Sequence, residues 1–201
     1  MKIASGGVCA AKGFKANGIH CGIRKNKSKT DLSLILSEVP ASCAAVYTTN
    51  LVYGAPITVT RKHLKNGKAQ AAICNSGIAN TCCTGGVEVA EEICAAAADV
   101  LGISADDMVI ASTGVIGMPL DPEPIKKGLP ELTAGLNENG SDMAAAGIMT
   151  TDTVKKEIAF EFTVGGKTCR IGGIAKGSGM IHPNMGTMPC FVTTDCAISP
   201  A

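Results

Sequence analysis

The sequence predicts an α+β fold in which helices and sheets stack as αββα layers. Segments with the alternation of β-strands are separated by segments with helical spacing. The pair Gly165–Gly166 joins two alternating segments, which is typical of a hairpin. The chain has 201 residues, of which 46% are hydrophobic and 17% charged, as expected of a globular protein with a full core. We therefore expect one domain over residues 1–201.

The first half of the chain contains three strand-like segments. Residues 31–38 and 43–50 are apolar and β-branched, and Val39-Pro40 between them indicates a turn. Residues 70–80 begin as a buried strand and end in a glycine turn. These segments predict two paired strands followed by a third.

Helices are predicted in the middle of the chain. Residues 86–102 keep apolar side chains at helical spacing, and Gly102 is a plausible stop. Residues 108–117 form a short apolar strand that breaks into a turn. Residues 121–136 and 142–149 have helical patterns, and we expect Pro130 to break the first of them.

The clearest local pattern is near the C-terminus. Ile158, Phe160, Phe162 and Val164 alternate with more polar residues before the Gly165–Gly166 turn. Cys169 and Ile171 then alternate on the returning strand. The chain ends in a further strand that begins near Phe191.

Composition excludes several functional classes. The net charge of +1 and an aromatic content of 3% argue against nucleic-acid binding, and no apolar run reaches membrane-spanning length. The N-terminus lacks the apolar region of a secretion signal, so we expect a cytoplasmic protein. The ten cysteines form no CxxC pair and are expected to be reduced packing residues. The three histidines lack ligand spacing, so we expect neither metal nor cofactor.

The segment KGSGMIHPNMGTMPCF (residues 176–191) places Thr187 after Gly186. A threonine hydroxyl needs a base before it becomes a nucleophile. Cleavage of the Gly186–Thr187 bond would free an α-amino group with a pKa of about 7.7–8.0, which can serve as that base. The small Gly186 lets the hydroxyl reach the preceding carbonyl carbon. An ordinary loop threonine is the alternative interpretation.

Acyl transfer also needs donors for a developing oxyanion. Thr113 and Gly114 follow the strand of residues 108–111 and offer a hydroxyl and a backbone N–H. An ordinary strand-to-loop turn explains the same two residues. His182 lies near Thr187 in sequence, and we interpret it as a loop histidine.

Together these segments resemble the ornithine acetyltransferase family, the bifunctional glutamate N-acetyltransferase/amino-acid acetyltransferase proteins of arginine biosynthesis. The matching motifs run in order through the whole chain, and the last is the most specific. They are GVCAAKGFKANGIHCGIRK, VYTTNLVYGAPI, CNSGIANTCCTG, ASTGVIG, MTTDT and GGIAKGSGMIHPNMGTM.

The resemblance implies a self-cleaving precursor of about twice this length. Residues 1–186 would correspond to the α chain and residues 187–201 to the start of the β chain, with Gly186–Thr187 as the scissile bond. Thr187 would be the nucleophile, Thr113 and Gly114 would form the oxyanion hole, and Thr150 and Lys176 would contact substrate. For Thr150 and Lys176 the plain alternatives are a helix-end hydroxyl and a solvated surface lysine.

The implied reaction is ping-pong acetyl transfer. Thr187 would take acetyl from N-acetylornithine and pass it to glutamate, and some members also use acetyl-CoA as donor. The implied fold is αββα, similar to the N-terminal-nucleophile hydrolases, and is incomplete without the β chain. A complete protein would resemble an α2β2 heterotetramer, and we expect residues 1–201 alone to be inactive.

Three residues depart from the family pattern. Gly186 replaces alanine, Ile78 replaces asparagine, and Pro189 replaces leucine just inside the expected final strand, where proline cannot donate to a sheet. Two other functions remain open. One is a threonine-nucleophile amidohydrolase with water as acceptor. The other is a non-catalytic fragment whose sheet edge pairs with a partner chain.

Overall fold

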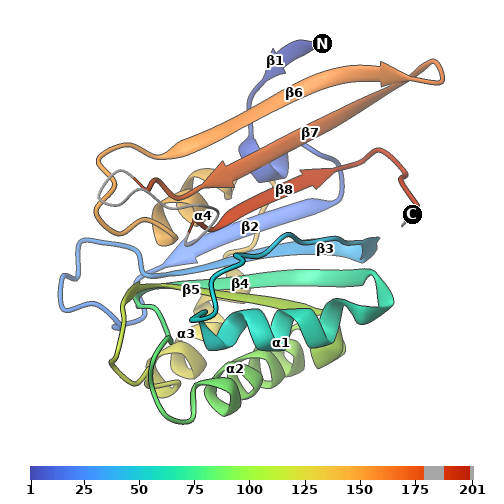
Figure 1. The fold of residues 1–201 in the computed structure, drawn as a ribbon. Helices are drawn as coiled ribbons and strands as arrows, with labels where there is room; N and C mark the ends of the chain where they lie inside the picture. The colour runs from blue at the N-terminus through green and yellow to red at the C-terminus, as the bar shows by residue number, and fades with distance from the viewer. Residues whose placement is uncertain (179–187, 200–201) are drawn as a thin grey trace.

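The computed structural model describes residues 1–178 and 188–199, which form two stacked sheets with helices (Figure 1). The first sheet is antiparallel, in the order β1-β6-β7-β8. Its strands are β1 (Lys2–Ala4), β6 (Lys156–Val164), β7 (Lys167–Ala175) and β8 (Cys190–Thr194). The second sheet has the order β2-β3-β4-β5, and its β4–β5 pair is parallel. Its strands are β2 (Phe14–Ile19), β3 (Leu32–Ser42), β4 (Lys68–Ile78) and β5 (Met108–Val115).

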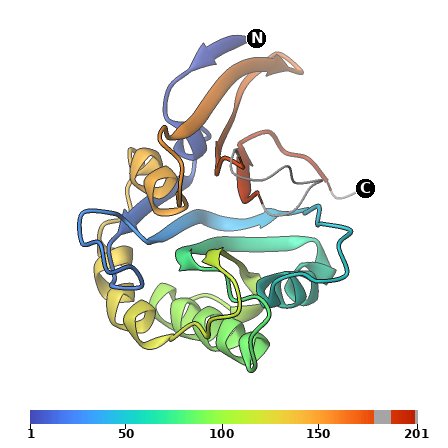
Figure 2. The ribbon, with the colours of Figure 1, turned by 60° about the vertical axis from the view of Figure 1, so that its left-hand side comes forward.

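Three helices cover the outer face of the second sheet, as the two ribbon views show (Figures 1 and 2). They are α1 (Ala55–His63), α2 (Gly86–Leu101) and α3 (Glu123–Ala134). The short helix α4 (Ser141–Gly147) packs against both sheets, as does the 3-10 turn η1 (Gly7–Cys9). Two further 3-10 turns are η2 (Leu64–Asn66) and η3 (Ala105–Asp107).

Two hydrophobic cores hold these layers together. The larger one lies between the second sheet and helices α1 to α3, and includes Leu34, Ile73, Ile93 and Leu129. The smaller one lies between the two sheets, and includes Val8, Ile148 and Ile174. Small residues let the layers approach closely. A Cβ added at Gly172 would lie 1.7 Å from the carbonyl oxygen of Gly7, so only glycine fits there.

The predicted fold class is confirmed. The helix predicted for residues 86–102 ends at Leu101, and Gly102 adopts the left-handed conformation that closes it. The hairpin of β6 and β7 turns at Gly165–Gly166, and the predicted strands near residues 70–80, 108–117 and 191 appear as β4, β5 and β8.

The prediction of two strands around a turn at Val39-Pro40 is wrong. One long strand, β3, continues through Pro40 to Ser42, and its register against β4 shifts between Leu36 and Ala41. The irregularity accommodates a proline, which has no N–H to donate. Residues 43–50 are not a strand but an irregular, mostly exposed segment.

Both expectations about interior prolines are also wrong. Pro130 does not break α3, which continues to Ala134. Pro189 lies just before β8 rather than inside it, and its carbonyl accepts a hydrogen bond from the Lys176 N–H at 2.9 Å. The pattern also missed β1, β2 and α1, which are too short or too polar to give a clear period.

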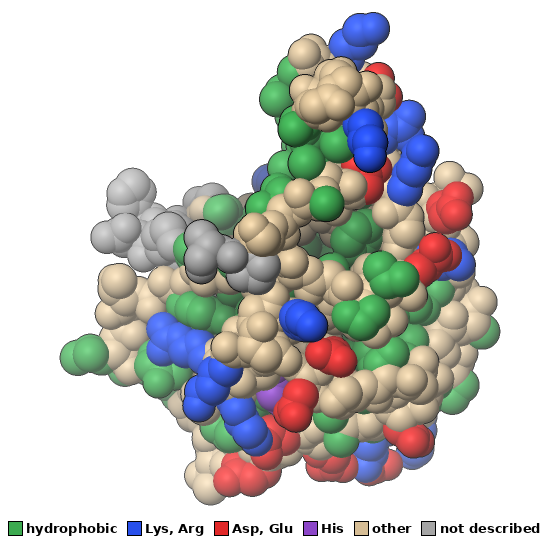
Figure 3. All heavy atoms as spheres, turned by 90° about the vertical axis from the view of Figure 1, so that its right-hand side faces the viewer, with side chains coloured by type: hydrophobic (Ala, Val, Ile, Leu, Met, Phe, Trp, Pro, Cys, Tyr) green, Lys and Arg blue, Asp and Glu red, His purple; other side chains and the backbone are tan. Residues whose placement is uncertain are grey.

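The outer face of the first sheet is rich in exposed hydrophobic side chains. Ile158 and Val164 of β6 are 54% and 52% exposed, and Val192 of β8 is 62% exposed. Ile3 of β1 lies opposite Phe160 on the same face. Hydrophobic side chains are visible along this projecting part of the molecule (Figure 3). The alternation in β6 is therefore real, but within the described residues its apolar side faces outward.

None of the described helices combines the length and the apolar character needed to cross a membrane.

Candidate functional site

The carboxyl ends of the parallel strands β4 and β5 form the base of the candidate site. Gly77 and Gly114 are paired across these strands, with φ values of 112° and 139°. A Cβ on Gly114 would lie 2.2 Å from the carbonyl carbon of Gly77. Position 114 must therefore be glycine for two reasons, the backbone conformation and the close approach. The neighbouring Thr113 is only 5% exposed.

A hydrogen-bond network stiffens the strand ends around Thr113. The Ser112 hydroxyl donates to Asn75 Oδ1 at 2.6 Å, and Asn75 Nδ2 donates to the carbonyl of Ile78 at 2.9 Å. Ser76, directly opposite Thr113, donates to the carbonyl of Gly147 at the end of α4 at 2.6 Å. The Thr113 hydroxyl makes no hydrogen bond to the described part of the chain, so these contacts leave it available to another group.

Arg24 connects the strand ends to the segment that follows α4. Its side chain packs over Gly77, where an added Cβ would lie 3.1 Å from Arg24 Cγ. Its Nη2 donates to the carbonyl of Met149, the residue before Thr150. The buried carboxylate of Asp31 accepts the backbone N–H of Arg24 at 2.9 Å and thereby fixes the loop that carries it. Arg24 Nε is buried and has no hydrogen-bond partner in residues 1–178 and 188–199.

Asp152 organises the other side of the site. Its carboxylate accepts hydrogen bonds from Lys156 Nζ at 2.8 Å, from the Gly177 N–H at 2.5 Å and from the Thr150 N–H at 3.3 Å. Its side chain is 2% exposed. Burial alone would raise the pKa of this carboxyl, but the hydrogen bonds from Lys156 and the two backbone N–H groups outweigh it and lower the pKa. Asp152 is therefore held as a carboxylate.

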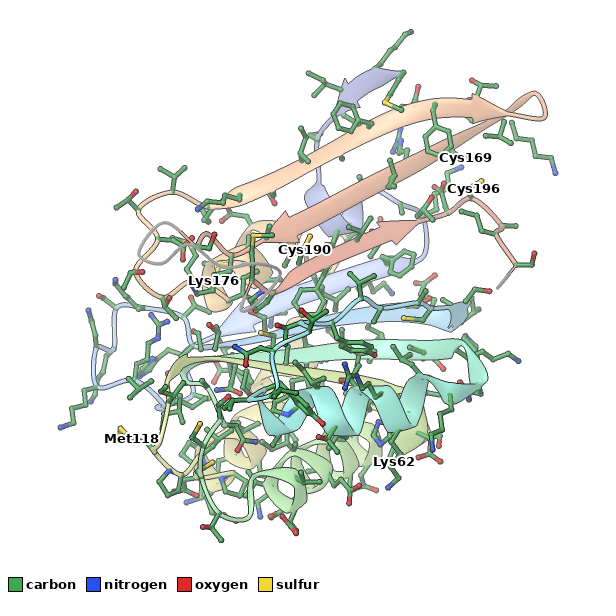
Figure 4. All side chains as sticks on the ribbon, in the orientation of Figure 1. Lys62, Met118, Cys169, Lys176, Cys190 and Cys196 are labelled. Atoms are coloured by element: carbon green, nitrogen blue, oxygen red, sulfur yellow. The ribbon has the colours of Figure 1, made fainter. Side chains whose placement is uncertain are left out.

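Lys176 is a buried cation beside Asp152. The residue is 8% exposed, and its Nζ lies 3.9 Å from Asp152 Oδ2 and donates to the carbonyl of Gly177 at 2.9 Å. It follows the end of β7, next to the start of β8 at Cys190 (Figure 4). The alternative of a solvated surface lysine does not fit this burial, whereas the predicted contact with substrate stays a prediction.

The structure brings the four described candidate residues to one end of the sheet sandwich. Thr113 and Gly114 are linked through Gly77 and Arg24 to the segment of Thr150, and Asp152 links that segment to Lys176. Gly186, Thr187 and His182 lie outside the described residues. The nearest described anchor after them is Pro189, hydrogen-bonded to Lys176.

Sequence reasoning missed Asp152 and Arg24. Both lie inside motifs that it singled out, Asp152 in MTTDT and Arg24 at the end of GVCAAKGFKANGIHCGIRK. One indication of their importance was present in the sequence, since each is a charged residue within a motif rich in glycine or threonine. Among the described residues, no three His, Cys, Asp or Glu side chains are grouped so that they could hold a metal ion.

Comparison with known protein families identifies the family of this chain. The model of the ArgJ family matches residues 15–201. The chain belongs to the ArgJ family. The resemblance to the ornithine acetyltransferases read from the motifs is thereby confirmed.

Curated ArgJ relatives are close in sequence. The chain is 53% identical over 196 residues to an arginine biosynthesis bifunctional protein ArgJ from Gloeobacter violaceus. It is 50% identical over 201 residues to the protein of the same name from Thermosynechococcus vestitus. These matches cover 96% and 98% of this chain but only 48% and 47% of the relatives. The chain thus spans about half the length of the curated ArgJ relatives it matches.

Solved ArgJ-family structures share the fold. The ArgJ protein of Bacillus halodurans is 44% identical with a TM-score of 0.83, and the match covers 92% of this chain and 95% of that chain. Ornithine acetyltransferase from Mycobacterium tuberculosis, solved in complex with ornithine, is 32% identical with a TM-score of 0.82. That match covers 94% of this chain and 99% of the other.

Proposed function

We propose that the full-length protein transfers acetyl from N-acetylornithine to glutamate through an acetyl-threonine at Thr187. The observation that carries this proposal is the convergence at one site of Thr113, Gly114 and the Lys176–Asp152 pair. The names of the ArgJ relatives place those proteins in arginine biosynthesis, and one solved relative was crystallised with ornithine. Both support an amino-acid substrate that carries an acyl group.

The proposed cleavage generates the nucleophile. The Thr187 hydroxyl attacks the Gly186 carbonyl carbon, the peptide bond becomes an ester, and water hydrolyses the ester to release the Thr187 amine. Support comes from chain lengths: the matching chains in the two solved relatives are covered to 95% and 99%, whereas curated relatives are about twice as long. A precursor that divides near this point accounts for both values.

In the transfer step, the Thr187 amine takes the hydroxyl proton while Oγ1 attacks the acetyl carbonyl carbon. Thr113 Oγ1 and the Gly114 N–H stabilise the oxyanion, the C–N bond breaks, and the proton passes to the departing amine of ornithine. The glutamate amine then attacks the acetyl ester and restores the threonine. Lys176, held by Asp152, offers a positive charge to the substrate carboxylate, and Thr150 contributes its hydroxyl.

The deciding experiment uses the full-length protein and its Thr187→Ala variant. We expect mass spectrometry to find chains that end at Gly186 and begin at Thr187 in the wild type, and one uncut chain in Thr187→Ala. The matched variant Thr187→Ser keeps a hydroxyl and should still be cut. Ornithine release from N-acetylornithine should vanish in Thr187→Ala, and an undiminished rate would contradict the proposal.

Acceptor identity is tested with the same assay. Ornithine release should depend on added glutamate and be matched by N-acetylglutamate formation. Full-rate release without glutamate would assign the amidohydrolase function instead. Replacing N-acetylornithine by acetyl-CoA tests whether acetyl-CoA is a second acetyl donor. Thr113→Ala should lower kcat by about 10²- to 10³-fold, as expected for loss of one oxyanion donor, and Thr113→Ser should retain most activity.

The other parts of the proposal concern the whole protein. The β chain would be the second half of the same precursor, and the complete enzyme an α2β2 heterotetramer in the cytoplasm. On this proposal residues 1–201 alone are inactive, since the rest of the site would come from the second half.

A further inference from the structure

Two cysteines, Cys169 and Cys196, lie near each other at the end of the β7–β8 ladder (Figure 4). The last paired residues at this end are Ile171 and Thr194. The next pair continues the register, because the Asp195 N–H donates to the Arg170 carbonyl at 3.3 Å and the Arg170 N–H donates to Asp195 Oδ1 at 2.7 Å. One residue further along are Cys169, in β7, and Cys196, at a bend beyond the end of β8.

The geometry of this position suits a disulfide. Arg170 and Asp195 share one backbone hydrogen bond, so Cys169 and Cys196 lie where the next, non-hydrogen-bonded pair would fall if the ladder continued. Residues opposite each other in that row have Cα atoms about 4.5 Å apart, within the range of about 4.4 to 6.8 Å that disulfides span. Both cysteines lie at the same end of the sheet (Figure 4), close enough for the Cys196 thiol to be one of the groups that raise the pKa of Cys169.

The two cysteines differ in solvent exposure. Cys169 is 9% exposed, and burial, followed by the neighbouring Cys196 thiol and Asp195, raises its pKa. Cys196 is half-buried. Attack on an external disulfide therefore begins at Cys196, and Cys169 acts second.

We propose that Cys169 and Cys196 form a redox-reversible disulfide that ties β7 to the segment after β8. The oxidant is a small-molecule disulfide such as oxidised glutathione. The Cys196 thiolate attacks it and releases one small thiolate, and the Cys169 thiolate then attacks the mixed disulfide and releases the second. The two protons lost by the protein thiols end on the two small thiols, so two thiols are oxidised and one disulfide is reduced.

If the chain is cleaved as proposed above, this disulfide would link the two resulting chains, a role that rests on the proposed function. Cleavage between Gly186 and Thr187 would leave Cys169 on the first chain and Cys196 on the second. Oxidation would then join the two chains covalently next to the β7–β8 pairing, and reduction would leave them joined by non-covalent contacts. The same bond in an uncut protein would be intramolecular.

Peptide mapping of the full-length protein tests the bond itself. The folded protein is incubated with oxidised glutathione, alkylated, digested with trypsin and analysed by mass spectrometry. Trypsin isolates Cys169 in residues 168–170 and leaves Cys190 with Cys196 after Lys176, so the matched control is Cys190→Ser. Cys190 is six residues from Cys196, about 20 Å along an extended chain, and lies opposite Ala175.

We expect the residue 168–170 peptide to be crosslinked in the wild type and in Cys190→Ser, and to lose the crosslink in Cys196→Ser. No crosslink in the folded wild type, or a crosslink that survives Cys196→Ser and disappears in Cys190→Ser, would overturn the proposal. Electrophoresis with and without reductant separates this outcome from the proposed cleavage, because only the reduced sample shows whether the chain is cut. An uncut chain with the crosslink keeps the disulfide and rejects cleavage, whereas cut chains without the crosslink keep cleavage and reject the disulfide.

Discussion

At the scale of single residues, the carboxylate of Asp152 holds together three parts of the candidate site. It accepts hydrogen bonds from the segment after α4, from the start of β6 and from the segment after β7. Lys176 lies 3.9 Å from it. A lysine this buried is seldom found without a partner of opposite charge. Asp152 is therefore a positioning residue for Lys176.

Replacing Asp152 by asparagine should destabilise the protein in a pH-dependent way. The folded-state pKa of Asp152 is lowered from the usual 3.8, so its ionised form stabilises the fold at pH values above that range. At pH 7 we expect Asp152→Asn to lower the free energy of unfolding by about 1 to 3 kcal/mol, the range for hydrogen bonds to charged groups. The difference should shrink as the pH falls below about 4, the ordinary range of an aspartate in the unfolded chain, and toward the lower pKa of the folded state.

Denaturant unfolding of both proteins between pH 7 and pH 3 measures this difference. The control is Asp142→Asn, which removes an ion pair with Lys155 whose side chains are 53% and 40% exposed. Such a pair contributes little, about 0 to 1 kcal/mol. A constant difference between wild type and Asp152→Asn across this pH range would show that the carboxylate charge has no role in stability.

Sequence reasoning reached some of these residues and missed others for physical reasons. Thr113 and Gly114 were predicted because the ASTGVIG segment matches a family motif, whereas their position at a strand end is equally typical of an ordinary turn. Asp152 and Arg24 act through contacts with residues far away in the chain. The sequence around a single charged residue does not indicate which distant residues will contact it in the folded protein.

At the scale of elements, long periodic segments were predicted well and irregular ones were not. The helix α2 and the β6–β7 hairpin follow their patterns closely. Residues 43–50 look like a strand because they are β-branched and apolar, yet β4 pairs instead with the extended β3 and with β5. Which strands pair with each other is determined by tertiary packing and not by local β-propensity.

Pro130 provides a test at this scale. It lies on the exposed side of α3, inside the helix, where proline removes a backbone hydrogen bond to the carbonyl of Lys126. We expect Pro130→Ala to raise the free energy of unfolding by about 1 to 3 kcal/mol, because alanine restores that donor and has a higher helix propensity. Thermal unfolding of the two proteins measures the change.

The matched control for Pro130 is Pro124→Ala, in the first turn of the same helix. A proline there costs little, since the first N–H groups of a helix have no intrahelical partner. A gain from Pro124→Ala as large as that from Pro130→Ala would mean that the stabilisation does not come from the interior hydrogen bond.

At the scale of the whole molecule, the two sheets are covered unequally. Helices α1 to α3 pack on the outer face of the second sheet, while the outer face of the first sheet presents Ile158, Val164 and Val192. Contiguous exposed hydrophobic residues of this kind mark a surface that becomes covered. The curated relatives are about twice as long, so we expect the second half of a full-length protein to cover this face.

A chain of residues 1–201 should consequently self-associate more than the full-length protein. We expect Ile158→Lys combined with Val192→Lys to reduce this association, since a charge opposes burial of the face. Val100→Lys on α2, where the valine is 46% exposed, should leave it unchanged. Sedimentation velocity over a range of concentrations measures this association. If residues 1–201 stay monomeric, the exposed hydrophobic face does not drive association and the prediction is wrong.

The bare sheet face also has a consequence for biosynthesis. In a relative twice as long, the first half leaves the ribosome while about 200 residues are still to be made, which takes about 10 to 40 s at typical elongation rates. During that interval β6 and β8 expose their hydrophobic side chains to the crowded cell. We therefore expect the first half to be prone to aggregation until the rest of the chain has been made and can cover this face.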